Sequence, residues 1–186
     1  MDNIETEKVI QNIILNQLGL PADYGKDEDG FIIPSVYVFA PNVSIGSTDR
    51  LQICIQTIGT RVIANNSHFV DVDDKLIDIQ ELVLNEIVQI DIFSRNNDAR
   101  LRRFEVLAAL HSTFAKQKQE ECNIKIFEIP NNVNTLNTSE GSSKIYRYAV
   151  TISVMSKKQY KSSIDYYDRF RIKAYSECIA NENTIV

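Results

Sequence analysis

Histidines, cysteines and clustered carboxylates are the residues of this sequence that could perform chemistry, and they are few. The chain has two histidines and three cysteines, and the cysteines are widely spaced with no CxxC pair. A cysteine nucleophile needs a base within hydrogen-bond reach of its thiol, so the sequence leaves open a pairing of Cys54 with His68 or of Cys122 with His111. Because these thiols lie in apolar patterns, where cysteine behaves as a small hydrophobic residue, we expect no catalytic site and no enzyme.

One run of carboxylates, from Asp71 to Glu81, has a spacing that invites a test for metal binding. Its first residues begin as an EF-hand loop does, but Leu76 occupies the position that must be Gly, and flanking helical patterns are missing. We therefore expect a solvated acidic turn between strands, with no metal and no cofactor. The acidic surface predicted here comprises Asp71, Asp73, Asp74 and Asp78.

Nucleotide and nucleic-acid binding also find little support. Neither GxxxxGK[ST] nor GxGxxG occurs, and Asp91, Glu121 and Lys125 are too loosely spaced to favour a metal-dependent nuclease. The formal charge is −5 and the pI about 5.1, whereas proteins that neutralise phosphates carry basic surfaces. The longest basic cluster, within Arg100–Arg103, lies in a helical pattern, and we interpret it as a solvated helix face.

Length and composition predict one domain over residues 1–186. The chain is 44% hydrophobic and 24% charged, which is ordinary for a globular protein. No apolar run approaches the ~20 residues of a membrane span, and the acidic N-terminus is not a signal peptide. Together with the unpaired cysteines, this predicts a protein made in a reducing cytoplasm, with no membrane partner.

Two helices are expected to cover a sheet. An apolar stripe from Val9 to Leu18 predicts a first helix over residues 3–18, ended by Gly19 and Pro21. Residues 21–30 read as a polar loop. A second helix is expected over residues 97–118, with a buried face that we expect to consist of Leu101, Phe104, Leu107, Ala108, His111, Phe114 and Ala115.

Alternation of apolar and polar residues predicts the strands, most clearly over 86–93 and 145–154. Residues 131–144 are polar and rich in turn formers, which predicts either a mobile loop or a segment that becomes ordered on a partner. Residues 177–186 read as a flexible tail. The fold class is therefore α+β, an α/β sandwich-like domain with a mainly antiparallel sheet and a core over about 30–170. The remaining strands are expected over 31–39, 51–55, 61–64, 68–72, 122–129 and 160–166, with a less clear pattern around 76–79.

The order of three β patterns resembles a known family. IVQIDIF (87–93) is followed by a capped helix, then by NIKIF (123–127) and YRYAVTI (146–152), and a tyrosine-rich run extends from Tyr160 to Phe170. This layout resembles the tail terminator (neck) proteins of contractile and other long-tailed bacteriophages over roughly residues 30–170. The acidic segment 21–30 has no place in the family's pattern.

The resemblance implies a non-enzymatic virion protein, assembled in the host cytoplasm into a homo-oligomeric ring, commonly a hexamer. Such a ring ends the tail tube and joins the tail to the head connector or neck, and it can contact the tail sheath. DNA would pass through its lumen without specific binding, which suits the negative charge and an acidic lumen surface. In such a ring, the polar segment 131–144 would meet the tube or a neighbouring subunit through Asn131, Asn134, Leu136, Asn137, Ser139 and Glu140.

Other functions stay open at this point. A head–tail connector adaptor, or a tube or baseplate component, is built from similar small α/β or β-rich units. A small cytoplasmic enzyme or a regulator is a third class, and it would require a pocket with convergent polar groups.

Overall fold

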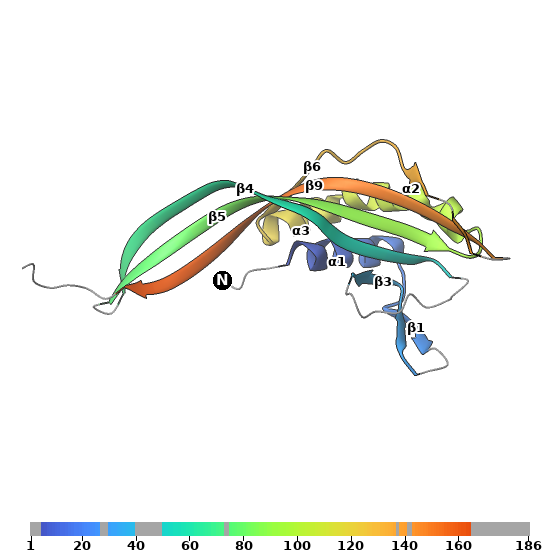
Figure 1. The fold of residues 1–186 in the computed structure, drawn as a ribbon, viewed down its shortest axis with the longest axis horizontal. Helices are drawn as coiled ribbons and strands as arrows, with labels where there is room; N and C mark the ends of the chain where they lie inside the picture. The colour runs from blue at the N-terminus through green and yellow to red at the C-terminus, as the bar shows by residue number, and fades with distance from the viewer. Residues whose placement is uncertain are drawn as a thin grey trace, which may run out of the picture.

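Three helices lie against one face of a long, twisted sheet in the computed structural model (Figure 1). It describes residues 5–26, 30–39, 50–72, 75–136, 138–140 and 143–164. For residues 71, 72, 75, 76, 138–140, 143, 144, 163 and 164 it describes the backbone alone. Within these residues the architecture is α+β, with a sheet dominated by antiparallel pairs, as the sequence predicts.

The main sheet has the strand order β3-β4-β5-β9-β6, and β7 and β8 also pair with β9. Only the β3–β4 pair of this sheet is parallel, and β1 and β2 form a separate antiparallel hairpin. The elements are α1 (Thr6–Leu18), β1 (Asp23–Lys26), β2 (Ile32–Pro34), β3 (Val36–Val38), β4 (Gln52–Val72), β5 (Lys75–Ser94), α2 (Asp98–His111), α3 (Thr113–Glu121), β6 (Ile124–Phe127), β7 (Asn134–Thr135), β8 (Thr138–Glu140) and β9 (Ser143–Ile164).

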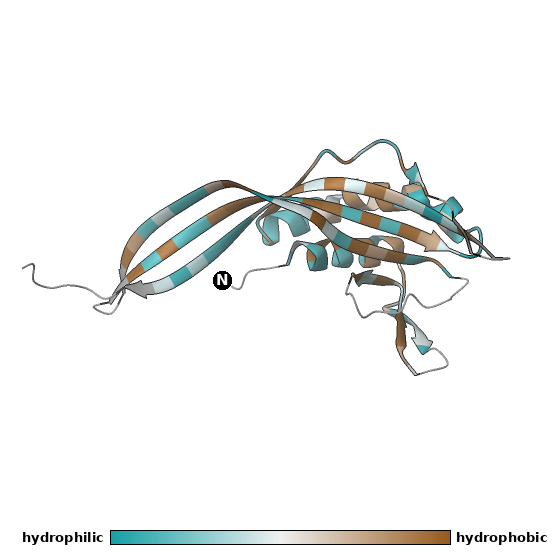
Figure 2. Cartoon of the chain, viewed as in Figure 1, coloured by the Kyte–Doolittle hydropathy of each residue, from teal (hydrophilic) through white to brown (hydrophobic). Residues whose placement is uncertain are grey.

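The core lies between the helices and the half of the sheet next to them. Val88, Ile90 and Ile92 of β5 alternate toward the helices and are fully buried, because successive side chains of a strand point to opposite faces. The stripe of α1 packs onto them through Val9, Ile10, Ile13 and Ile14, as predicted. Figure 2 shows this alternation of hydrophobic and hydrophilic residues along the strands.

The first helix ends where the sequence predicts. Gly19 takes the left-handed conformation, with φ of 59°, which glycine adopts without the steric cost of a Cβ. The guanidinium of Arg102 then donates a hydrogen bond to the Leu18 carbonyl at 2.9 Å. A cation at a helix C-terminus interacts favourably with the helix dipole, so Arg102 belongs to the fold and is not merely part of a solvated face.

The prediction of one helix over 97–118 is wrong, because Ser112 divides it. Ser112 has an extended backbone, and its hydroxyl accepts a hydrogen bond from the Ala115 amide at 3.0 Å. A serine that caps a new helix in this way satisfies an amide that has no partner in the first turn. The chain therefore forms two helices, α2 and α3, at this point.

The predicted buried face of the second helix is wrong in part, since Leu107 and Ala115 are buried as predicted and Phe114 is partly buried against the core, but four other residues are not. Leu101 and Phe104 are 72% and 52% exposed, and Ala108 and His111 are also exposed. A smaller aliphatic stripe, Ala99, Val106, Leu107 and Leu110, with Ala109 beside it, faces the core instead. Phe104 lies beneath the Arg103 guanidinium, 4.5 Å from it, so a cation covers the ring that was expected to pack on the sheet.

Several predicted strands join into three long ones. The strands expected at 51–55, 61–64 and 68–72 are parts of β4, the pattern near 76–79 continues into β5, and 145–154 is the centre of β9. The strand expected over 31–39 divides into β2 and β3 at Ser35, and the one over 122–129 shortens to β6. The strand expected over 160–166 is the end of β9 as far as Ile164, beyond which it lies outside the described residues.

Segment 131–144 is not simply a mobile loop. Asn134 and Thr135 pair with β9, the Leu136 amide donates to the Arg147 carbonyl at 2.8 Å, and β8 pairs with the start of β9. The edge of β9 has amides and carbonyls that need partners, and the backbone of this polar segment supplies them. The predicted C-terminal tail, residues 177–186, lies outside the described residues, as do residues 3 and 4 of the predicted first helix.

Candidate functional site

The two thiol–histidine pairs that the sequence left open are not formed. Cys54 and His68 lie on the same strand, fourteen positions apart in β4, which at ~3.3 Å per residue separates them by about 45 Å along the strand. Cys122 follows α3 and His111 precedes it, so a helix about 14 Å long lies between them. Cys54 is buried beside Tyr37 of the neighbouring strand β3, and burial raises the pKa of its thiol to about 11. Such a thiol is protonated at neutral pH and a poor nucleophile.

The loosely spaced nuclease residues are also apart. Asp91 is buried on the sheet face opposite the helices, where the Arg147 guanidinium binds it at 3.1 Å. Glu121 of α3 pairs with Lys118, and Lys125 of β6 lies opposite Met155, six residues along β9 from the partner of Asp91. Within the described residues, no three His, Cys, Asp or Glu side chains are close enough to share a metal ion.

An open depression of about 460 Å³ lies between α3, β6 and β9. Lys116, Lys125 and Lys157 contribute to its lining, together with the carboxylate of Glu120. Its lining contains neither a cysteine nor a histidine, and the hydroxyl of Ser156, which the lining includes, donates a hydrogen bond to Glu86 at 2.8 Å.

The acidic residues expected to line a lumen are placed only in part. Asp78 lies on the helix-facing side of β5 near the far end of the strand, half-buried, and accepts a hydrogen bond from Gln80 at 3.1 Å. Asp73, Asp74 and the side chain of Asp71 lie outside the described residues.

The residues expected at an interface follow the edge of the sheet. Asn131, Asn134 and Leu136 are exposed. Asn137 lies outside the described residues, as do the side chains of Ser139 and Glu140, whose backbone forms β8. What the structure adds is that Asn134 and Leu136 are held against β9 by backbone hydrogen bonds.

The most unusual feature is an arm that extends beyond the helices. It consists of β4 from Gly59, β5 up to Ile87 and β9 from Ser153, and it projects from the body as a single curved layer (Figure 1). Strands of 20 to 22 residues span about 70 Å, whereas most strands have 5–6 residues. A sheet normally buries one face against a second layer, and the arm has no such layer among the described residues.

One face of the arm combines apolar and basic side chains, and we call it the outer face. On the central strand β5, Ile77, Ile79, Val83 and Ile87 point away from the helix side, as the register requires. Cations lie on both flanking strands at the same face, opposite Asn85, Val83 and Ile79. They are Arg61 on β4 and Lys157 and Lys161 on β9, all exposed.

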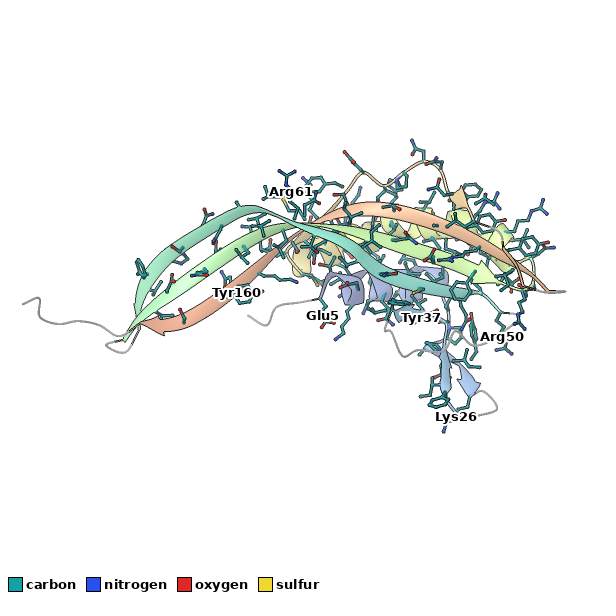
Figure 3. All side chains as sticks on the ribbon, viewed as in Figure 1. Glu5, Lys26, Tyr37, Arg50, Arg61 and Tyr160 are labelled. Atoms are coloured by element: carbon teal, nitrogen blue, oxygen red, sulfur yellow. The ribbon has the colours of Figure 1, made fainter. Side chains whose placement is uncertain are left out.

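The polar residues of the outer face are already hydrogen-bonded within it. The Ser153 hydroxyl donates to the Asn85 side chain at 2.6 Å, and the Gln159 amide donates to Glu81. Figure 3 shows Arg61 and Tyr160 on the arm, and the register places Tyr160 on the opposite, inner face. The inner face also exposes Phe69 and Val62.

Both edges of the arm are poor templates for a further strand. β4 shifts register between Thr57 and Gly59 and again between Val62 and Ala64, and such bulges interrupt the ladder. On the other edge β9 carries lysines 157, 158 and 161. Bulges and edge lysines are the devices by which proteins avoid edge-to-edge pairing, so a partner of the arm would contact its faces.

A buried carboxylate joins the arm to the body. Glu86, on the helix-facing side of β5, accepts hydrogen bonds from the Thr6 hydroxyl of α1 and from the Ser156 hydroxyl of β9, the latter at 2.8 Å. Lys158 lies 3.7 Å from its other oxygen. The Thr57 hydroxyl also donates to Glu7, so the first turn of α1 holds both β4 and β5 at the base of the arm.

The β1–β2 hairpin projects from the opposite end of the body (Figures 1 and 3). Its base is fixed, because the Tyr24 hydroxyl donates to the Leu51 carbonyl at 2.7 Å and the Arg50 guanidinium lies 5.2 Å from the Tyr24 ring. Farther out, Ile32 is 63% exposed. A two-stranded hairpin has too few side chains to form a core of its own.

No protein-family model and no curated protein matches the chain. Among the described residues, none of the helices has the length and apolar character needed to cross a membrane.

Proposed function

We propose that this chain is a structural assembly protein, a tail terminator (neck) subunit that forms a ring, ends the tail tube and joins the tail to the head connector of a long-tailed bacteriophage. In this proposal its location is the neck of the virion. Its partners are further copies of itself, commonly six in a ring, the tail tube protein, the connector and, in a contractile tail, the sheath.

The observation that carries the proposal is the arm. A single-layer sheet with apolar side chains exposed on both faces is typical of a surface that another chain covers. The shielded edges favour contact through faces, which permits a closed ring rather than unlimited strand addition. The buried, protonated Cys54 thiol and the separated histidines supply no reason to prefer an enzyme.

The test is a capping assay with the tail tube protein encoded beside this chain. Tubes polymerised alone should grow to variable lengths, and addition of the purified chain should stop growth and leave a ring at one tube end in negative-stain electron micrographs. A variant with Ile79→Asp and Val83→Asp on the outer face should lose capping but keep its circular dichroism spectrum. Tubes unaffected by the wild-type chain would refute the proposal, and binding to the connector without binding to tubes would assign the chain to the connector adaptors.

A further inference from the structure

The depression between α3, β6 and β9 concentrates positive charge. Its lining contains Lys116, Lys125 and Lys157, all three exposed, against one carboxylate, that of Glu120. Among the described residues, none of these three ammonium groups forms an ion pair. Because the whole chain carries a formal charge of −5, the cluster of cations is a local feature, and such a cluster attracts an anionic ligand.

The same depression has an apolar part. Ile124 and Met155 belong to its lining, the first buried and the second half-buried. Its volume of about 460 Å³ falls within the range of about 300–1,000 Å³ that is typical of ligand sites, which combine apolar side chains with a few polar groups. A ligand that fills the depression therefore gains from an apolar group as well as from negative charge.

The positions of two of the lysines set the spacing of those negative charges. Lys125 of β6 pairs with Met155 of β9, and Lys157 lies two residues farther along β9. Two residues of a strand span about 7 Å and neighbouring strands lie about 4.8 Å apart, so the Cα atoms of the two lysines are about 8 Å apart. Alternate residues of an extended peptide are separated by about 7 Å, and the residue between them points to the opposite side. Two carboxylates at alternate positions of a peptide match the lysines, and the residue between them can then cover Met155.

A nucleic acid fits the depression less well. Single-stranded bases stack on aromatic rings, and the described lining contains no ring. The ring of Phe127, close by on β6, already lies under the Lys125 ammonium group, 5.1 Å from it. A phosphate backbone binds through its charge and makes no use of Ile124 or Met155.

We propose that this depression binds an extended acidic segment of a partner protein, in which one apolar residue stands between two carboxylates. The carboxylates pair with Lys125 and Lys157, and the apolar side chain covers Met155. Complementary charge of this kind selects the partner and fixes its register. The contact goes beyond the proposed ring, because it lies where α3 and β6 border the origin of the arm (Figure 1) and does not depend on ring closure.

Methyl NMR of the full chain tests the contact directly. The chain has two methionines, Met1 and Met155, so labelling with ¹³C-methyl methionine gives two methyl signals, and Met155→Leu identifies the one in the depression. The probe is the blocked pentapeptide Gly-Glu-Leu-Glu-Gly. Its titration should move the Met155 methyl signal to a saturating value, because the leucine side chain then lies against that methyl group.

Charge variants test the role of the lysines. Lys125→Glu with Lys157→Glu should weaken binding of the pentapeptide about tenfold or more, because like charges then face each other. Both positions are exposed, so the circular dichroism spectrum should stay unchanged. The matched control, Arg95→Glu with Arg100→Glu, makes the same change in net charge at exposed positions near the other end of β5, and it should bind the pentapeptide as the wild type does.

Variant peptides test the two parts of the ligand. Replacing both glutamates of the pentapeptide by glutamine, or its leucine by serine, should weaken binding about fivefold or more in each case. A Met155 signal that does not move, equal binding by the two charge variants, or equal binding of all three peptides would overturn the proposal. A pentathymidylate that moves the Met155 signal at lower concentration than the pentapeptide would also overturn it, since the lysines would then serve phosphates.

Discussion

Replacement of Glu86 by alanine should destabilise the fold by about 3–5 kcal/mol, the usual cost of removing one member of a buried charged group. Its carboxylate is buried and receives two hydroxyl hydrogen bonds, from Thr6 and Ser156, with Lys158 at 3.7 Å. Hydrogen bonds to a charged group contribute about 1.5–3 kcal/mol each, so the two hydroxyl bonds alone account for this range.

The measurement is urea denaturation followed by far-UV circular dichroism, since the chain has no tryptophan to report by fluorescence. Glu86→Gln is the informative companion. Both hydroxyls bind the same oxygen, Oε2, and an amide retains one acceptor oxygen, but both bonds then lose their charged acceptor, so this variant should cost about 2 kcal/mol, less than Glu86→Ala. Glu81→Ala, which removes one half-buried hydrogen bond on the outer face, is the positional control. A cost for Glu86→Ala below about 1 kcal/mol, or equal to that of Glu81→Ala, would refute the reasoning.

Three further predictions concern the helices, the thiol and the sheet edge. Leu110→Ala should lower the free energy of unfolding by about 2–5 kcal/mol because Leu110 is buried. Phe104→Ala should lower it by about 1 kcal/mol or less, because the Phe104 ring is half exposed and lies under a guanidinium. Equal losses for the two variants in urea denaturation would contradict the orientation of α2. In a chain whose other cysteines are serine, Cys54 should react with iodoacetamide at pH 8 far more slowly than after unfolding. Burial raises the pKa of the Cys54 thiol to about 11. The stability that the protonated thiol contributes is therefore fully present below the ordinary thiol pKa and is lost as the pH rises toward 11. Rapid alkylation of the native chain at pH 8 would argue against burial of Cys54. The amide of Leu136, which donates to the Arg147 carbonyl, should show protection in hydrogen-exchange NMR of the free subunit, and exchange at the rate of an unstructured chain would restore the mobile-loop hypothesis.

The sequence predicts elements better than it predicts which side of an element is buried. The stripe of α1 is clear, because Val9, Ile10, Ile13 and Ile14 share one side of the helix and all four are buried. In α2 two apolar arrangements compete, one with the larger residues Leu101 and Phe104 and one with Val106 and Leu110. The smaller set packs on the sheet, and the Arg103 guanidinium lies over both the Phe104 ring and the Tyr148 ring of β9. The size of a side chain alone does not determine its burial.

The arm could not be recognised from local pattern because a strand normally ends within a few residues. The sequence nevertheless contains two signs of a long strand. From Lys75 to Ser94 neither glycine nor proline occurs. Ile77, Ile79, Val83 and Ile87 occupy alternate positions of this segment, and polar Glu81 and Asn85 fill the two remaining positions between them. Breaks were expected where Asn65 and Asn66 suggest a turn, yet these residues pair within β4. Whether the chain continues as a strand at these asparagines depends on the residues opposite them on β5, which are distant in the sequence. The outer face could not be predicted either, because it combines residues from three strands.

In an assembly subunit, the faces and the edges of such an arm have to meet different requirements. If its faces were polar, nothing would attract a neighbouring subunit, and if its edges were regular, strands of many copies would pair without limit. The observed arm exposes apolar residues on its faces, while bulges in β4 and lysines in β9 interrupt its edges. In the proposed ring, a specific face contact has a fixed rotation between copies, and a fixed rotation either closes into a ring or continues as a helical filament. The Glu86 contacts at the base of the arm hold the arm relative to the body, and this angle sets that rotation. Loosening it with Glu86→Ala at a temperature where the variant remains folded should therefore broaden the distribution of oligomer sizes, whereas Glu105→Ala, which removes an exposed carboxylate of α2, should leave that distribution unchanged.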